Sequence, residues 1–346
     1  MSERRLFLDR GIGVTRGVVT VDGRAERLLL QRHDDEPRLT LGARMVARVA
    51  SVEPAIATAF LDLGGGHEAI LPFKSEARPI RGGAVEIEIR SEPRDGKLAV
   101  ARLIGDGEGA PRLIAQAPDV AGALQMLVHD VSIVEGRQAR DVADDAEAEA
   151  LETVHPLPGG GTLAIEPTRA LTAIDVDLGE RKGADAKRVT RQANHAALAE
   201  SARLLRLKGL GGLVVLDLVG RGHDGTALLA AARLAFGPDN PGVAIGPVGR
   251  FGTMELSIPR RTRPLLERLR QADGTLNDRT LAERLIRRVQ AEAEAQPGAR
   301  LVAACSPTVA KTAEPLARLL ADRIGARFVI TSDPMCPRER VDVAAA

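Results

Sequence analysis

The sequence predicts a multidomain protein of mixed α+β and α/β class, with a small β-barrel near the N-terminus and a strand-and-helix region after it. Three observations support this prediction. The chain has 346 residues, which is enough for two or three domains. About five short strand-like runs fall within about 65 residues of the N-terminal third. Beyond residue 155, apolar strand-like runs alternate with longer helix-like stretches.

The first elements have the pattern of strands. Residues 4–10 and 15–32 predict strands, with a tight turn at Asp22-Gly23, because an Asp-Gly pair favours a two-residue hairpin. Residues 42–74 alternate short apolar runs with Gly and Pro, and residues 82–104 continue the pattern with a hairpin around Asp95-Gly96. We interpret this second group as a small barrel such as an OB fold.

The character of the chain changes after residue 105. Residues 105–111, GDGEGAP, predict a linker, residues 117–130 a short helix and residues 131–136 a strand. Residues 141–152 predict an acidic helix or a linker. Residues 155–167, HPLPGGGTLAIEP, open a new unit with a turn and a strand.

The remainder alternates strands and helices, which indicates α/β organisation. Gly209 to Gly212, GLGG, predict a helix stop and a turn rather than a phosphate loop. Helices are expected over residues 185–208, 225–236, 280–295 and 312–325, and strand-like segments over 209–220, 241–256, 299–306 and 326–333.

The composition excludes several classes of protein. No apolar run is long enough to span a membrane, and the start MSERRLFLDRGIG lacks a signal-peptide core, so we expect a cytoplasmic protein with no membrane partner. The two cysteines, Cys305 and Cys336, cannot form a disulfide framework or a four-thiolate zinc site. The six histidines have no metal-binding spacing, and His129 and His195 are expected on helix surfaces. The net charge of +1 restricts any nucleic-acid surface to a local patch, and the absence of Trp and Tyr leaves base stacking to a few Phe residues.

Two aspartates interrupt an apolar run, ALTAIDVDLGE, over residues 170–180. Asp175 and Asp177 share one face of the predicted strand, because side chains at i and i+2 of a strand point the same way. The helix and strand that follow predict a parallel neighbour carrying Asp217 at its carboxyl end. Carboxylates placed together in this way suit Mg²⁺ or Mn²⁺. The alternative is structural, since aspartates at strand ends often cap the next helix or accept backbone N–H groups.

The sequence resembles the ribonuclease E/G family. The resemblance runs in order through LPGGGTLAIEPTRALTAIDVD (157–177), RQANHAALAESARLLRLKGLGGLVVLDLV (191–219) and GRFGTMELS (249–257). It implies a Mg²⁺-dependent endoribonuclease, with Mn²⁺ as an alternative ion, that cuts single-stranded, often A/U-rich RNA in RNA processing or decay and leaves 5′-phosphate ends.

The resemblance also implies the division of the chain into domains. The OB-fold barrel, of the S1 RNA-binding type, would occupy residues 39–105, inserted in a ribonuclease H-like subdomain made of residues 1–38 and 106–157. A DNase I-like catalytic subdomain would follow over residues 158–265. A small α/β C-terminal domain would comprise residues 266–346.

The resemblance implies roles for the aspartates. Asp175 and Asp217 would be the metal ligands and catalytic residues, and Asp177, where the family usually has Asn, would support the catalytic site. Asn194 matches a family Asn at the start of the crossover helix and is expected near the RNA. Gly220 stands where many members carry another Asp, so some support of the site is expected to be missing.

The resemblance further implies RNA-binding residues. Phe60 matches an aromatic residue that stacks on RNA, although a place in the barrel core is equally compatible with the pattern. Lys97 matches a basic residue, but a solvated hairpin lysine is the alternative, and Ile70 replaces a second aromatic residue. Arg250 aligns with a position near the substrate. The run 257–290 has nine Arg, four acids and no Lys, which fits phosphate binding or an exposed helical face.

Two parts of larger family members have no counterpart here. The short linker 105–111 leaves no room for the subdomain that senses RNA 5′ ends, and the stretch LLERLRQADGTLNDRT (265–280) holds no CPxC zinc-link motif. We therefore expect no structural zinc and no zinc-linked dimer, while other oligomers stay possible. Two other functions stay open: a non-catalytic RNA-binding protein, favoured by Ile70, Gly220 and the near-neutral charge, and a metal-dependent phosphatase or nucleotide hydrolase, which would not need the barrel.

Overall fold

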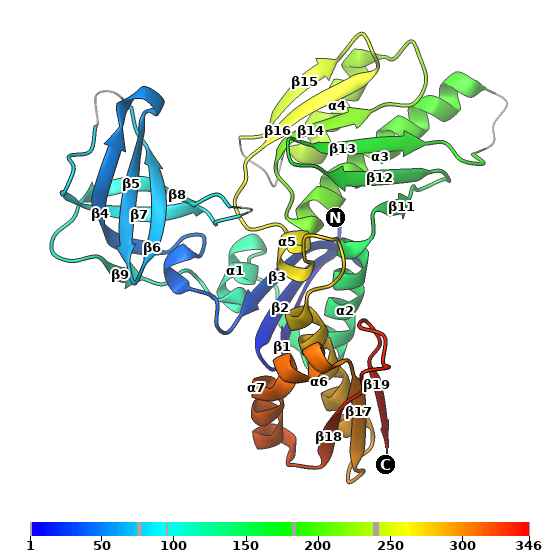
Figure 1. Cartoon of the computed structure of the whole chain (residues 1–346). Helices are drawn as coiled ribbons and strands as arrows, with labels where there is room; N and C mark the ends of the chain where they lie inside the picture. Colours follow the sequence, from blue (N-terminus) through cyan, green and yellow to red (C-terminus); the bar gives the residue numbers. More distant parts are fainter. Residues whose placement is uncertain (1, 75–77, 95, 182–184, 238–241, 346) are drawn as a thin grey trace.

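The computed structural model describes residues 2–74, 78–94, 96–181, 185–237 and 242–345, in which the strands form four sheets. The barrel lies to one side of the molecule. The sheet that runs from β11 to β16 and the C-terminal unit lie at opposite ends of the remainder (Figure 1). The N-terminal sheet and its helices lie between these two ends. The chain is therefore a mixed α+β protein. Across the described residues, no helix combines the length and apolar character needed to cross a bilayer.

The N-terminal sheet has the order β10-β1-β2-β3. Asp22 and Gly23 form its tight turn, with φ values of 50° and 78°, which a two-residue hairpin of the mirror-image type requires. The acidic stretch predicted as a helix or a linker is a helix, α2, which buries four alanines on one face: Ala139, Ala143, Ala146 and Ala150. The elements are β1 (Arg4–Arg10), β2 (Val14–Val21), β3 (Arg24–Arg32), α1 (Val120–Leu127), β10 (Ile133–Glu135) and α2 (Arg137–Leu151).

The second sheet closes into a five-stranded barrel, because β4 pairs with both β5 and β7 and thereby joins the two ends of the sheet. The strands β6 and β8 pair in parallel. The barrel interior follows strict alternation, as in β5, where Ala59, Leu61 and Leu63 are buried. This arrangement is OB-like, as predicted. The strands are β4 (Arg44–Glu53), β5 (Thr58–Gly64), β6 (His67–Pro72), β7 (Ala84–Ser91), β8 (Ala99–Asp106) and β9 (Arg112–Ala115), with short 3₁₀ helices η1 (Pro37–Leu39) and η2 (Pro54–Ile56).

The strand β9 extends the barrel beyond the expected residue 105. Met45 and Val46 of β4 pair with Leu113 and Arg112 of β9. The resemblance implies that Arg112 and Leu113 belong to the ribonuclease H-like subdomain, but they pair with the barrel sheet. The predicted turn at Asp95-Gly96 cannot be compared in full, because Asp95 lies outside the described residues.

The third sheet, which carries the aspartates, has the order β11-β12-β13-β14-β16-β15. Only β13 and β14 run parallel in the described sheet, because the helix α3 crosses from one to the other. The helices α3 and α4 pack together and cover the face that bears the buried apolar side chains, and the opposite face is open (Figure 1). The elements are β11 (Val154–Pro156), β12 (Thr162–Pro167), β13 (Thr172–Asp177), α3 (Ala186–Lys208), β14 (Gly212–Asp217), α4 (Gly225–Phe236), β15 (Ala244–Val248) and β16 (Thr253–Ile258).

The C-terminal unit is a three-stranded sheet of order β18-β17-β19 with packed helices. The stretch KTAEPLARLL is helical despite Pro315, which lies inside α7. The elements are α5 (Leu265–Leu269), α6 (Asp278–Ala295), β17 (Leu301–Cys305), α7 (Pro307–Ile324), β18 (Phe328–Ser332) and β19 (Asp342–Ala345).

A buried ionic cluster joins the N-terminal sheet to α2 and α6. Arg16 is fully buried and donates to Oδ2 of Asp9 at 2.6 Å and to Oε2 of Glu147 at 3.1 Å. Arg284 and Arg287 of α6 contact the same Glu147 at 2.9 and 3.3 Å. Burial alone would raise the pKa of Glu147, but Arg287, Arg16 and Arg284 outweigh it and lower the pKa to about 2.

Most arginines of the run 257–290 have partners inside the protein, and some of these contacts join different units. Eight of its nine arginines have side-chain partners within the protein, so a general phosphate-binding role for the run is not favoured. The contacts are Arg260 to the carbonyl of Gly211, Arg263 to Glu267, Arg268 to Asp35, Arg270 to the carbonyl of Leu151, Arg279 to Glu283, Arg284 and Arg287 to Glu147, and Arg288 to the carbonyl of Val341.

We expect Glu147→Gln to lower the free energy of unfolding at pH 7 by about 3 kcal/mol, because Arg16 and Arg287 would then remain charged in a buried site. The native pKa of about 2 lies below the ordinary value of 4.5, so this stabilisation is complete above pH 4.5 and is lost as pH falls toward 2. Urea denaturation at pH 7 and pH 3 measures both effects. The matched control is Asp145→Asn, an exposed position of the same helix. Equal stability of the two variants at pH 7 would contradict the proposed role of the cluster.

Candidate active site

Asp175 and Asp217 lie side by side at the carboxyl ends of β13 and β14. They are register partners in the parallel pair, so their Cα atoms are separated by about one strand spacing, roughly 4.8 Å. Both side chains are exposed on the open face of the sheet. Their other neighbours in the row are Ala164 and Thr253. The predicted placement of the two aspartates together is therefore confirmed.

Aspartates at strand ends can serve only to accept backbone N–H groups, and among the three aspartates this holds for Asp177 but not for Asp175 or Asp217. Asp177 accepts a hydrogen bond through Oδ1 from the backbone N–H of Gly179 at 2.8 Å, and so forms the turn that follows β13. Within the parts of the chain that the structure describes, Asp175 and Asp217 have no hydrogen bond or ion pair through their carboxylates. Two exposed carboxylates without an internal partner are available for a ligand.

The donor set fits a hard divalent cation. Asp175 and Asp217 offer carboxylate oxygens, which Mg²⁺ and Mn²⁺ prefer, and Mg²⁺ is commonly held by one or two carboxylates together with water and substrate phosphate. Among the described residues, no group of three or more His, Cys, Asp or Glu side chains is arranged to hold a metal. A cation at this place would therefore have two protein ligands.

Asn194 fixes the loop that follows β14. Its Nδ2 donates to the carbonyl of Val219 at 3.0 Å, and its Oδ1 accepts from the N–H of Val219 at 3.1 Å. The side chain is only 1% exposed. The expected place of Asn194 near the RNA stays a prediction, and in the structure both ends of its amide hold α3 against this loop. Its role is thus one of positioning the carboxyl end of β14.

The conformation of the same loop favours glycine at position 220. Its φ is +91°, a conformation that L side chains rarely adopt, and a Cβ there would lie 2.6 Å from Cγ2 of Thr190 on α3. The loop therefore has no space for the additional Asp found at this position in many members of the resembling family. A side chain at this position would require Thr190 or the loop to move.

The tip of the β15–β16 hairpin lies beside the end of β14. The N–H of Leu218 donates to the carbonyl of Gly252 at 3.1 Å, which ties the tip to the residue after Asp217. The Arg250 guanidinium lies 4.8 Å from the centre of the Phe251 ring, and that ring is 80% exposed. Arg250 thus belongs to the hairpin whose tip contacts the residue after Asp217, and its expected place near the substrate stays a prediction. Phe251 was not singled out from the sequence, although it lies within the GRFG motif.

The barrel presents Phe60 outward. Phe60 pairs with Ile70 of β6, and Ile70 pairs with Val100 of β8, so these three side chains form a row on the outer surface. Because the neighbours Ala59 and Leu61 fill the interior, the alternative that Phe60 belongs to the barrel core is wrong. Lys97 is exposed in the β7–β8 hairpin.

The barrel is tied to the segment that follows β16. The backbone N–H of Glu92, just after β7, donates to the carbonyl of Arg261 at 2.8 Å. The Glu92 carboxylate accepts from the N–H of Leu41 at 3.2 Å and from the N–H of Arg263 at 2.9 Å. These contacts attach the barrel to the chain emerging from the aspartate-bearing sheet.

Comparison with known proteins agrees with this geometry. Residues 116–261, which include all three aspartates, Asn194 and Arg250, match the profile of the Ribonuclease E/G family. These residues belong to the ribonuclease E/G family. The outward-facing Phe60 and Lys97 of the barrel lie outside the matched residues.

Several curated relatives share this region. Ribonuclease E of Escherichia coli (strain K12) is 29% identical over 153 residues, covering 43% of this chain and 14% of that protein. Ribonuclease E of Haemophilus influenzae is 36% identical over 118 residues, covering 32% of this chain and 12% of that protein. The chloroplastic ribonuclease E/G-like protein of Arabidopsis thaliana is 32% identical over 114 residues, covering 32% and 11%. The chain thus matches only a small part of the length of these ribonuclease E/G relatives.

We expect Asn194→Ala to lower the free energy of unfolding by about 2 kcal/mol, because both backbone groups of Val219 would lose their partner. Ser201→Ala, on the same helix, is the matched control: Ser201 is fully buried, and its hydroxyl has no hydrogen-bond partner among the described residues. That control should change stability by less than about 0.5 kcal/mol. Chemical denaturation compares the two, and equal losses would show that Asn194 does not hold the loop.

Proposed function

We propose that the protein is a metal-dependent endoribonuclease that hydrolyses single-stranded RNA in RNA processing or decay. The observation that carries the proposal is the register pairing of Asp175 with Asp217 on the open face of the sheet, where neither carboxylate has a partner in the described protein. The ribonuclease E/G match of residues 116–261 supports it. The reaction adds water across a backbone P–O bond and leaves a 5′-phosphate and a 3′-hydroxyl.

The proposed cofactor is Mg²⁺, with Mn²⁺ as an alternative. Asp175 and Asp217 would hold it, and when bound it would lower the pKa of a water molecule and neutralise charge on the phosphodiester. Asp177 stays in the turn made with Gly179 and would orient this edge of the site. Asn194 keeps the end of β14 in place through Val219.

Substrate binding is proposed to involve the barrel and the hairpin tip. Phe60, on the outer barrel surface, offers a stacking platform, and Phe251 offers another next to Arg250. Stacking requires bases that are free of a duplex, so single strands are favoured, and weakly paired A/U-rich segments supply them most readily. Lys97 would add a phosphate contact.

A second candidate is a non-catalytic RNA-binding protein. It is favoured by Gly220, where the close approach of Thr190 excludes the additional carboxylate, and by Ile70, where an aliphatic residue replaces an aromatic one beside Phe60. RNA binding without any Mg²⁺-dependent cleavage would support this candidate over the first.

We predict that Asp175→Asn and Asp217→Asn each reduce the cleavage rate by at least about 100-fold, because losing a carboxylate ligand removes several kcal/mol of transition-state stabilisation. RNA affinity should change little, since it depends on basic and stacking groups elsewhere. The assay is cleavage of a labelled A/U-rich single strand with Mg²⁺, with binding measured in parallel.

Asp177→Asn is the matched control for these variants. It makes the same chemical change on the same face of β13, and an Asn Oδ1 can still accept the N–H of Gly179. We expect it to keep activity within about fivefold of the wild type. Near-wild-type cleavage by Asp175→Asn or Asp217→Asn would show that the active site lies elsewhere, and complete loss in Asp177→Asn would indicate three carboxylate ligands.

We also predict little preference for RNA carrying a 5′-monophosphate over RNA carrying a 5′-hydroxyl. Between the end of β8 at Asp106 and the start of α1 at Val120, the chain forms only β9, which pairs with the barrel, so no subdomain is present there to bind a terminal phosphate. Cleavage rates on two RNAs that differ only at the 5′ end test this. A preference of tenfold or more would contradict it.

The second part of larger family members that has no counterpart here is the zinc-link motif. The sequence contains no CPxC motif, and we propose that the purified protein carries no stoichiometric structural zinc. Elemental analysis of the protein decides this. One zinc per two chains would contradict the proposal, whereas a dimer without zinc is compatible with it.

A further inference from the structure

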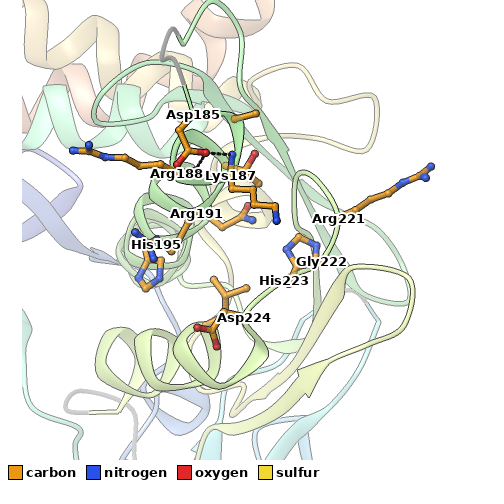
Figure 2. A pocket seen from close by; sticks show the side chains of 13 residues that line it. Asp185, Lys187, Arg188, Arg191, His195, Arg221, Gly222, His223 and Asp224 are labelled. Carbon is orange, nitrogen blue, oxygen red and sulfur yellow. Dashed lines mark hydrogen bonds between the residues drawn. The ribbon is translucent and has the colours of Figure 1, made fainter.

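A cavity of about 370 Å³ lies between the start of α3 and the loop that leads into α4 (Figure 2). This volume falls within the range of small-ligand pockets. The lining is dominated by basic groups. Its charged and titratable members are Lys187, Arg188, Arg191 and His195 from α3, Arg221 and His223 from the loop, and the acids Asp185 and Asp224.

The cavity lies at the same edge of the sheet as the aspartate pair, on the side covered by α3 and α4. The helix α3 follows β13 and α4 follows β14, so the cavity lies at the carboxyl ends of the strands that carry Asp175 and Asp217. Asn194 also lines it and hydrogen-bonds to Val219, just beyond β14. On another side, His223 lies against the hairpin tip, since a Cβ on Gly252 would be 3.3 Å from Nε2 of His223.

The charges of the cavity are unbalanced. Four permanent cations face two carboxylates, whereas the whole chain is nearly neutral, with 48 Lys and Arg against 47 Asp and Glu. Lys187, Arg188, Arg191 and Arg221 make no side-chain hydrogen bond or ion pair with any other described residue. Most arginines of the 257–290 run, in contrast, are used inside the protein.

The two acidic residues of the cavity, Asp185 and Asp224, accept hydrogen bonds from the first turns of α3 and α4. Asp185 accepts from the backbone N–H groups of Lys187 and Arg188 at 3.0 and 3.3 Å, and Asp224 accepts from the N–H of Ala227 at 3.0 Å. They are the N-caps of α3 and α4 and do not pair with the cations.

The basic residues come from two sides of the cavity. Figure 2 shows Lys187 extending toward the loop that carries Gly222 and His223, whereas the side chains of Arg188 and Arg221 point outward on opposite sides. The ring nitrogen Nε2 of His223 is buried and has no hydrogen-bond partner among the described residues. A site rich in unpaired donors and free of Phe suits an anion rather than a stacked base.

We propose that this cavity binds a backbone phosphate of the RNA strand, adjacent to the phosphodiester held at Asp175 and Asp217. The inference rests on the proposed function and extends it by naming where the strand is anchored. Lys187 and Arg191 supply the main contacts, Arg221 adds positive charge outside the rim, and the strand passes on to the hairpin tip with Arg250.

The test measures binding without cleavage. A 3′-labelled single-stranded RNA with a 5′-hydroxyl is titrated in EDTA at several salt concentrations, and its affinity is followed by fluorescence anisotropy. For Lys187→Gln/Arg191→Gln we expect about tenfold weaker binding at 0.1 M salt. The slope of log K against log salt should become shallower by about 0.7 for each backbone phosphate that the variant no longer neutralises.

The matched control is Lys311→Gln/Arg318→Gln. It removes the same charges from α7, which lies at the opposite end of the molecule from the cavity (Figure 1), and it should stay within twofold of the wild type. Arg221→Gln, a single change in a loop, guards against misfolding of the double variant and should bind about threefold more weakly. Circular dichroism of all variants confirms folding.

Unchanged affinity and salt slope in Lys187→Gln/Arg191→Gln and in Arg221→Gln would overturn the inference. So would an effect that appears only with 5′-phosphorylated RNA, because the cavity would then bind a terminal phosphate and not a backbone one. Wild-type protein that binds through the cavity but never cleaves would refute the proposed function alone. Wild-type cleavage together with unimpaired cavity variants would refute the cavity alone.

Discussion

The register of β13 against β14 is the constraint on which the candidate active site depends. Ile174 and Leu216 are partners in this register and are both buried, so the apolar face of the sheet fixes the pairing. Because side chains alternate along a strand, burial of this pair places Asp175 and Asp217 together on the opposite, open face. A slip of one residue would bury one carboxylate without a partner, which costs several kcal/mol. Packing of the core therefore positions the chemistry.

Contacts of the crossover helix α3 with other parts of the chain help to hold β13 and β14 in this register. The crossover helix α3 ends at Gly209 in the left-handed conformation and is clamped to the end of β14 by Asn194. Arg203 ties α3 to α2 through Glu149, and Arg206 ties it to the N-terminal sheet through Glu26. Many charges are used in such internal pairs, so a near-neutral chain can still hold a local excess of cations beside its aspartates.

Much of this architecture could be predicted from sequence, because local signals agree with the tertiary ones. Local patterns specify several elements: the Asp22-Gly23 pair specifies a turn, alternation specifies the barrel strands, and the amphipathic pattern specifies α3. The strand-helix-strand order predicts that Asp175 lies beside Asp217. Other features depend on contacts that no local pattern contains. The strand β9 has only a weak alternation and exists because β4 offers it a free edge. The orientation of Phe60 depends on which face of β5 closes the barrel. The basic cavity combines two separate segments, and its only local signal was the spacing of Lys187, Arg188 and Arg191 on one helix.

The central claim is that Asp175 and Asp217 share one divalent cation. Mn²⁺ titration followed by electron paramagnetic resonance, in the presence of a non-cleavable single-stranded DNA that supplies phosphate oxygens, measures this directly. The account predicts one site in the wild-type protein. It predicts that Asp175→Asn and Asp217→Asn each weaken this one site, because each removes a ligand of the same ion, that the double variant weakens it at least as much, and that Asp177→Asn retains it. Binding that is unaffected by Asp175→Asn and Asp217→Asn, or two Mn²⁺ sites of which each single variant removes one and leaves the other intact, would contradict the claim.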